Sequence, residues 1–278
     1  MSSRLVTSNL LHGRSLQDGA VDTARMLAAL TAMRPNVLAM QEVDRMQPRS
    51  AGVDQTAAVA SALAEEIQGD VYWRFVPAIL GEPGGVWSAA TGLDFASGHD
   101  LRGVERISTS YGTGLITTWP VQSWHVIVLK AFPWRAPVFI PGVNRWMFID
   151  DEPRVCVAAV VDAPWGVCTV ASAHLSFVPG WNVWQLRRLV RGLSSLPSPR
   201  ILLGDFNLPA PIPGVFSRWQ ALASGHATFP SPSPRLQLDH VLLDDPHERF
   251  PSVVATAAEE LTFSDHRAIV VDVSASGS

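Results

Sequence analysis

Polar side chains that can bind a metal or move a proton stand at the ends of short apolar segments, and in one case within such a segment. They are amides, carboxylates and imidazoles. The residues are Asn9, Glu42, His174, Asp205, Asn207, Asp239, Asp265 and His266. Because strands hold such side chains rigidly while loops leave room for a ligand, this placement favours a binding or catalytic site.

Each of these residues also has an ordinary structural interpretation. Glu42 would be a solvated residue after a strand, and Asp205 and Asp265 would make the hydrogen bonds of tight turns. Asp239 is different, because a carboxylate on the apolar strand Leu238–Leu243 is buried and needs a partner. A histidine is the obvious partner, and the joint occurrence of these residues favours a site over separate structural roles.

The types of the side chains select the chemistry of that site. Carboxylates and amides without a cysteine–histidine spacing make a hard oxygen site, which suits one or two Mg²⁺ or Mn²⁺ ions rather than zinc. Two histidines beside it would donate hydrogen bonds to an anion and transfer protons. A metal, imidazoles and an aspartate that orients water are the groups that hydrolyse a phosphate ester.

Alternating strands and helices must position these residues. Helical spacing of apolar residues predicts helices over Val21–Met33, from Asp54 as cap to Gln68, and over Trp181–Leu196. The predicted strands are Arg4–Ser8, Val37–Gln41 (ending at Glu42), Val71–Ile79, Gly114–Thr118, Val121–Leu129, Val155–Val161, Val167–Ala173, Ile201–Gly204, Leu238–Leu243, Ser252–Thr256 and Ala268–Val273. This mixture predicts an α+β layered sandwich in a single domain, 1–278, with irregular insertions at about 80–110 and 131–152.

The composition limits the kinds of partner and the cellular compartment that we expect. The 278 residues include 21 basic and 25 acidic side chains, so a net charge of −4 leaves no basic surplus for sequence-indifferent binding of nucleic acid. If Val161 faces Val167 in a hairpin, Cys156 and Cys168 lie about four residues, roughly 13 Å, apart and cannot form a disulfide. We expect reduced thiols, a cytoplasmic protein, no signal peptide and no membrane span.

Seven segments together resemble one known family. They are Ser8-Asn9-Leu10, Gln41-Glu42-Val43, Tyr111–Val121, Ser172-Ala173-His174-Leu175-Ser176, Leu203-Gly204-Asp205-Phe206-Asn207, Leu238-Asp239-His240 and Ser264-Asp265-His266. In this order, and over nearly the whole chain, the sequence resembles the endonuclease/exonuclease/phosphatase superfamily, which contains pancreatic deoxyribonuclease, abasic-site endonucleases, inositol-polyphosphate 5-phosphatases and neutral sphingomyelinases. The resemblance implies a four-layer α/β/β/α sandwich of two mixed, mostly antiparallel sheets, packed face to face with helices outside.

The resemblance also implies a role for each catalytic candidate. Asp205 would orient and activate the attacking water, and Asn207 would hold the phosphate or the nucleophile. His174 would contact the phosphate oxygens. His266, with its tautomer fixed by Asp239, would bond the phosphoryl group or act as acid and base.

A second group of residues would hold the metal. By the same resemblance Glu42 is the principal ligand, and Asn9 and Asp265 complete or flank the metal site. The sequence departs from many relatives at Thr118, where an arginine that could touch the substrate is missing. His240 follows Asp239 where an aromatic residue is common, and we expect it to pack rather than react. For His12 we expect an ordinary surface position, with a place at the rim of the cleft as the alternative.

Substrate preference depends on the loops. Lys130 is the one lysine, and three clustered arginines lie on a predicted helix whose ordinary interpretation is a solvated face. The insertion around Trp134 and Phe148 is rich in aromatic residues and proline, and suits a substrate with an apolar moiety or a partner protein. We therefore expect a metal-dependent phosphodiesterase or phosphatase that acts on a small or lipid-like phosphoester. An endo- or exonuclease acting on DNA or RNA is the first alternative, and a non-catalytic binding module of the same fold is the second.

Overall fold

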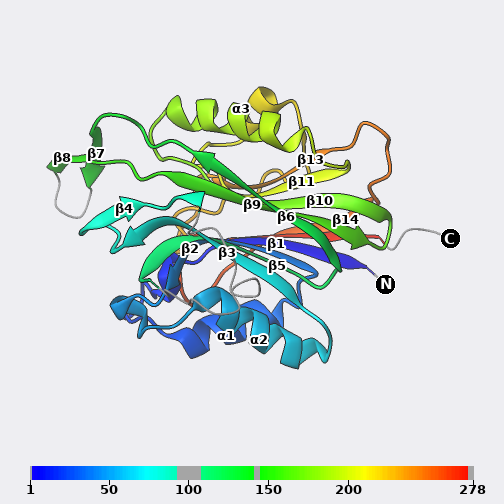
Figure 1. Ribbon diagram of the computed structural model, residues 1–278, viewed down its shortest axis with the longest axis horizontal. Helices are drawn as coiled ribbons and strands as arrows, with labels where there is room; N and C mark the ends of the chain where they lie inside the picture. The colour runs from blue at the N-terminus through cyan, green and yellow to red at the C-terminus, as the bar shows by residue number, and fades with distance from the viewer. Residues whose placement is uncertain (1, 93–107, 141–144, 275–278) are drawn as a thin grey trace.

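The computed structural model describes residues 2–92, 108–140 and 145–274. Most of its strands form two large sheets, and a separate hairpin forms a small third one (Figure 1). The first sheet has seven strands in the order β14-β15-β1-β2-β5-β3-β4. In chain order these strands are β1 Ser3–Asn9, β2 Val37–Arg45, β3 Tyr72–Gly81, β4 Trp87–Ala89, β5 Ser110–Thr117, β14 Val253–Glu259 and β15 Ala268–Val273.

The second sheet has six strands in the order β12-β13-β11-β10-β9-β6. In chain order they are β6 Val121–Leu129, β9 Arg154–Ala163, β10 Gly166–His174, β11 Arg200–Asp205, β12 Gln220–Ala221 and β13 Asp239–Asp244. Each large sheet contains one parallel pair, β1–β2 in the first and β10–β11 in the second. The other strand pairs of the described residues are antiparallel, so the sheets are mixed and mostly antiparallel, as predicted.

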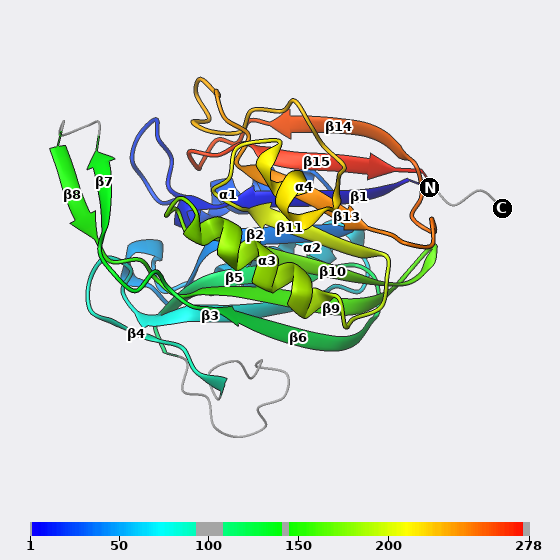
Figure 2. The ribbon, with the colours of Figure 1, turned by 90° about the horizontal axis from the view of Figure 1, so that it is seen from above.

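Helices cover the outer face of each large sheet. Figure 1 shows α1 (Thr23–Ala32) and α2 (Gln55–Ile67) beneath the first sheet and α3 (Trp181–Leu193) above the second; the short α4 (Ile212–Ser217) lies beside α3 (Figure 2). Three apolar clusters separate the four layers: one lies between the sheets, and one lies beneath each helical layer. The predicted α/β/β/α sandwich is thereby confirmed.

Local signals account for the helix boundaries. The carboxylate of Asp54 accepts a hydrogen bond from Ala57 N at 3.1 Å, which is the predicted cap of α2, and Asp22 caps α1 in the same way. Short 3-10 helices, Leu11–Gly13 and Pro48–Ser50, follow β1 and β2. None of the helices formed by the described residues has the length and apolar composition that a membrane crossing requires.

The second insertion contains more order than the sequence indicates. Ala136–Ile140 (β7) pairs with Arg145–Ile149 (β8), so the expectation of an irregular segment over 131–152 is wrong there. Figure 2 shows this hairpin projecting away from the two large sheets. In the first insertion, β4 pairs with the end of β3, and residues 93–107, like 141–144, lie outside the described part of the chain.

The cysteine hairpin differs from its predicted register by one residue. Val161 pairs with Cys168, and Cys156 pairs with Ala173, because the turn between β9 and β10 is shorter than expected. Cys168 lies in the core between the sheets, whereas Cys156 faces the helical layer. Both thiols are free and buried, so the conclusion that they form no disulfide is confirmed.

Gly204 allows β10 and β11 to approach each other next to the catalytic candidate Asp205. It pairs with Ala173, and a Cβ atom at position 204 would lie 1.9 Å from the carbonyl oxygen of Ala173. Backbone atoms on a neighbouring central strand cannot move aside cheaply, so this position requires glycine.

We expect Gly204→Ala to destabilise the protein by about 1–3 kcal/mol or more, because the added methyl group overpacks the centre of the sheet. The midpoint of urea unfolding measures this loss. Gly92→Ala is the matched control, since a Cβ atom there meets open space. Equal midpoints for the two variants would contradict the close approach.

Candidate active site

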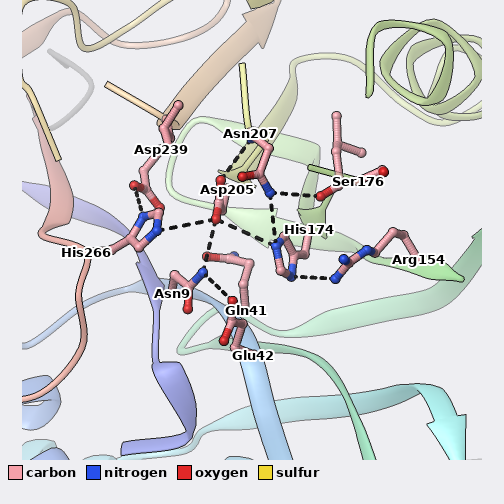
Figure 3. A network of polar contacts seen from close by, with 12 residues as sticks. Asn9, Gln41, Glu42, Arg154, His174, Ser176, Asp205, Asn207, Asp239 and His266 are labelled. Atoms are coloured by element: carbon pink, nitrogen blue, oxygen red, sulfur yellow. Dashed lines mark hydrogen bonds and ion pairs between the residues drawn. The ribbon is translucent and has the colours of Figure 1, made fainter. Parts of the chain in front are cut away.

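The predicted site residues other than Asp265 lie together in one polar network at an edge of the sandwich, where strands of both sheets contribute (Figure 3). In the second sheet His174 pairs with Asp205, and Asp205 pairs with Asp239, so three neighbouring strands carry them in one row. Residues that pair directly across strands point to the same face of a sheet. The row faces the first sheet, because Val170, which precedes His174 by four residues, lies in the core between the sheets.

A β-bulge in β2 turns Glu42 toward this row. The prediction that strand β2 ends at Glu42 is wrong, because the strand continues to Arg45. The pairing with β5 skips between Met40 and Val43, and Glu42 has a positive φ of 55°. An extra residue in a strand redirects the side chains beside it, and without the bulge Glu42 would alternate onto the helix-covered face.

Gln41, the other bulge residue, links the two sheets beneath the site. Its amide donates a hydrogen bond to Ser172 Oγ at 3.2 Å and accepts one from Thr7 Oγ1 at 3.2 Å. All three side chains are fully buried. This bridge fixes the distance between β2 and β10 where the site begins.

His266 and Asp239 form a buried pair, which gives Asp239 the histidine partner that the sequence indicated. His266 Nδ1 lies 2.8 Å from Asp239 Oδ2. The loop before β15 is held by Ser264 Oγ, which donates to Asn9 O and accepts from His266 N. Burial alone lowers the pKa of His266, but the carboxylates of Asp239, Asp205 and Asp265 outweigh it and raise that pKa to about 10.

Asp205 occupies the centre of the network and is 1% exposed. Its Oδ2 accepts a hydrogen bond from Asn9 Nδ2 at 3.0 Å and lies 3.6 Å from His174 Nε2 and 3.8 Å from His266 Nε2. Burial raises the pKa of Asp205 to about 7, with a further contribution from Asp239. A carboxylate with a pKa near neutrality accepts and releases a proton readily at physiological pH.

Asn207 contacts both Asp205 and His174. Its backbone N donates to Asp205 Oδ1 at 2.9 Å, and its Nδ2 donates to Leu175 O at 3.0 Å. The same Nδ2 lies 3.3 Å from His174 Nε2. Asn182, at the start of α3, donates to Asn207 O and so ties this turn to the helix.

Three expected metal residues border the buried part of the site. Asn9 Nδ2 donates to Glu42 Oε1 at 3.1 Å, so this amide joins Glu42 to Asp205. Glu42 and Asp265 both remain partly exposed. Burial among protein atoms, together with the charge of Asp265, raises the pKa of Glu42. A cation between these carboxylates would relieve their mutual repulsion.

Arg154 belongs to the same network, and the sequence reasoning missed it. Its NH1 lies 3.2 Å from His174 Nδ1, and its NH2 lies 3.7 Å from Asp151 Oδ1. The side chains of Arg154 and Asp151 are both buried. A charged residue directly before the apolar run Val155–Val161 was the available signal, because a buried guanidinium needs partners.

Three other polar residues that the sequence analysis singled out, His240, His12 and Thr118, do not belong to this network. His240 stacks on Phe206 and contacts Leu208 O through Nε2 at 2.8 Å, so it packs as expected. His12 is half-buried rather than on the surface, and burial together with Arg49 lowers its pKa to about 4. Thr118 accepts a hydrogen bond from Asn36.

Comparison with known proteins identifies a family that matches the sequence and solved structures that have a similar fold. The model of the Endonuclease/Exonuclease/phosphatase family matches residues 6–266. No curated protein matches the sequence. An endonuclease/exonuclease/phosphatase from Beutenbergia cavernae DSM 12333 has a similar structure, with a TM-score of 0.65 and 21% identity over 99% of this chain and 72% of that one.

Two further solved structures have the same fold at lower identity. A mannosyl-6-phosphatase from Bacteroides thetaiotaomicron VPI-5482 has a TM-score of 0.58 and 14% identity over 98% of this chain and all of the other. Sphingomyelinase C from Streptomyces griseocarneus has a TM-score of 0.55 and 13% identity over 99% of this chain and all of the other. At these identities the likeness concerns the fold.

In the metal-free protein we expect His266 to stay protonated until the pH approaches about 10, and Asp239→Asn to lower that pKa. Because the folded pKa is raised, the pair's contribution to stability is complete below the ordinary value of 6.5 and is lost as the pH rises through about 10. A proton NMR titration of His266 measures the change. Asp244→Asn, which removes the negative charge that pairs with Arg200 far from the site, is the control, and an equal pKa in both variants would contradict the pairing.

Proposed function

Since the chain belongs to the endonuclease/exonuclease/phosphatase family, we propose that it is a metal-dependent hydrolase of phosphoester bonds in which an activated water attacks phosphorus in line. The observation that carries this proposal is the position of Asp205. This carboxylate has a pKa of about 7 and lies within 4 Å of two histidines that come from different sheets. A base flanked by donors matches the needs of attack on a phosphoryl group.

Each residue of the network has a part in this reaction. Asp205 takes a proton from the attacking water, and Asn207, held by Leu175 O, orients the water or a phosphoryl oxygen. His266 is cationic beside Asp239, so it stabilises negative charge on the phosphoryl group and supplies a proton to the leaving oxygen. His174 donates a hydrogen bond to the same group.

The donor set fits a divalent cation. Four carboxylates converge at this edge, those of Glu42, Asp205, Asp239 and Asp265, and Asp239 Oδ1 is buried without a hydrogen-bond partner in the described part of the chain. We propose that Glu42 and Asp265 hold Mg²⁺ or Mn²⁺. Asn9 flanks Glu42, because its nitrogen donates to the carboxylates of Glu42 and Asp205 while its oxygen accepts a hydrogen bond from Leu11 N. When bound, such an ion supplies charge stabilisation for the transition state.

The surface near the site supports a phosphoester with an apolar moiety. A hollow of about 660 Å³ lies between the turn before β4 and the segment before β7, and Trp134 on its wall is 70% exposed. Phe148, on β8, is 60% exposed. Asp151 lines the same hollow and contacts Arg154, which contacts His174. A phosphatase and a sphingomyelinase are among the proteins with this fold, which is consistent with a small or lipid-like substrate.

We expect the wild-type protein to hydrolyse bis-p-nitrophenyl phosphate with Mg²⁺ or Mn²⁺, and to lose this activity in EDTA. Asp205→Asn should lower kcat by about 10²- to 10⁴-fold, because the amide cannot accept the proton of the water. Asp162→Asn, at an exposed position that bonds Gln122, is the control. Near-normal turnover by Asp205→Asn would refute the assignment.

The same assay with other substrates tests the class. Bis-p-nitrophenyl phosphate, p-nitrophenyl phosphate and plasmid DNA distinguish a diesterase, a monoesterase and a nuclease. A preference for plasmid DNA would replace the proposal with the nuclease alternative. The absence of metal-dependent hydrolysis of every substrate would favour a binding module.

We expect Trp134→Ala to lower kcat/KM for a phosphodiester with a long alkyl chain by about 5- to 30-fold, which corresponds to about 1–2 kcal/mol of lost apolar contact. The same variant should leave bis-p-nitrophenyl phosphate hydrolysis unchanged. Phe216→Ala, an exposed aromatic residue on α4, is the control. If Trp134→Ala lowers both activities equally, the hollow does not select the apolar moiety.

A further inference from the structure

The guanidinium of Arg154 lies behind His174, on the side of the ring away from Asp205. Figure 3 shows the order Arg154, His174, Asp205 across the site. Arg154 begins β9, its side chain is 8% exposed, and its NH1 lies 3.2 Å from His174 Nδ1. The Nδ1 atom of His174 therefore contacts a cation, whereas the Nδ1 atom of His266 contacts the carboxylate of Asp239.

A guanidinium fixes the position of the imidazole proton. Arginine has five N–H donors and no acceptor at any physiological pH, so the ring nitrogen that faces it must present a lone pair. His174 Nδ1 is that nitrogen. A neutral imidazole carries one proton, which consequently resides on Nε2.

The proton on Nε2 points into the reaction centre. Nε2 of His174 lies 3.6 Å from Asp205 Oδ2 and 3.3 Å from Asn207 Nδ2. Because Asn207 Nδ2 is also a donor, two N–H groups stand side by side next to the proposed base. Adjacent donors of this kind are the arrangement that stabilises a developing negative charge on oxygen.

The same contact opposes a second proton on the ring. Burial, and then the charges of Arg154 and His266, hold the pKa of His174 well below its ordinary value. The charged groups around the ring are Arg154 on β9, Asp205 on β11 and His266 before β15. His174 thus stays neutral, and its partner at Nδ1 is a cation where His266 has the carboxylate of Asp239.

Arg154 is itself held in place. Asp151 lies 3.7 Å from its NH2, and the other carboxylate oxygen of Asp151 accepts hydrogen bonds from Ser176 Oγ and Phe132 N, both at 2.8 Å. Asp151 also lines the aromatic hollow. The chain of contacts Asp151–Arg154–His174 therefore connects the base of the insertion with the reaction centre.

We propose that Arg154 is a positioning residue that fixes His174 as the neutral Nε2–H tautomer, so that His174 donates a hydrogen bond to a phosphoryl oxygen and leaves proton transfer to His266. The effect on turnover rests on the proposed function. The tautomer itself does not, because it follows from the contact between Arg154 and His174.

Nitrogen-15 NMR of the wild-type protein tests the tautomer directly. With ¹⁵N-labelled histidine, we expect His174 to show a protonated Nε2 and an unprotonated Nδ1 between about pH 5.5 and 8.5, across the range in which ordinary histidines titrate. His174→Gln assigns the signals. A protonated Nδ1, or an imidazolium in this range, would overturn the proposal without any variant of Arg154.

Two variants test the donors and the charge of Arg154. Arg154→Gln removes the charge and adds an amide oxygen that can accept a hydrogen bond from a protonated Nδ1, so the Nδ1–H tautomer should appear and the pKa of His174 should rise. Arg154→Met removes the donors and the charge, and should give a mixture of tautomers and a kcat lowered by about 10- to 100-fold with little change in KM, the usual effect of losing a residue that orients an active-site imidazole. Arg200→Met, which breaks the remote pair with Asp244, is the control.

The outcomes distinguish the two proposals. If Arg154→Met does not fold, the wild-type spectrum and Arg154→Gln carry the test. If folded Arg154→Met keeps the wild-type tautomer and kcat, Arg154 does not position His174. If the protein hydrolyses no phosphoester but His174 shows the expected tautomer, the proposed function fails and the assignment of Arg154 stands.

Discussion

A nearly fully buried carboxylate, Asp205, stands where the two sheets meet, and the rest of the site depends on how it is accommodated. Asn9 from the first sheet donates to it, Asn207 N donates from the adjoining turn, and His174 and His266 lie within 4 Å. A buried charge is tolerated only with such partners. Because they come from elements up to 196 residues away in the chain, the carboxylate can be satisfied only after both sheets have packed.

Opposite partners give the two histidines different properties. Asp239 raises the pKa of His266, whereas burial and then the charge of the neighbouring Arg154 lower the pKa of His174. When the surroundings of two similar groups give them different charge states, one group can act as a hydrogen-bond donor and the other can transfer protons. The fold provides this separation because β13 carries the carboxylate to one side of Asp205 and β9 carries the guanidinium to the other.

Much of this arrangement was predictable, and the errors have physical causes. Strand ends and buried polar residues identified the row of His174, Asp205 and Asp239, since strand position and burial are local consequences of apolar patterning. The end of β2 was placed wrongly at Glu42, because a bulge depends on pairing with β5. The β7–β8 hairpin and the shifted register of β9 against β10 were missed because pairing is decided between segments, not within them.

The sequence by itself determined which residues could form the site, the order of the elements, and the layered fold. Apolar periodicity sets these elements, and the polar interruptions at their ends are visible in the chain. Only the tertiary structure decided that Glu42 turns inward, that Gln41 bridges the sheets, and that Arg154 stands behind His174. The reason is that a side chain's direction and charge state depend on its neighbours in space, and packing two sheets face to face chooses those neighbours.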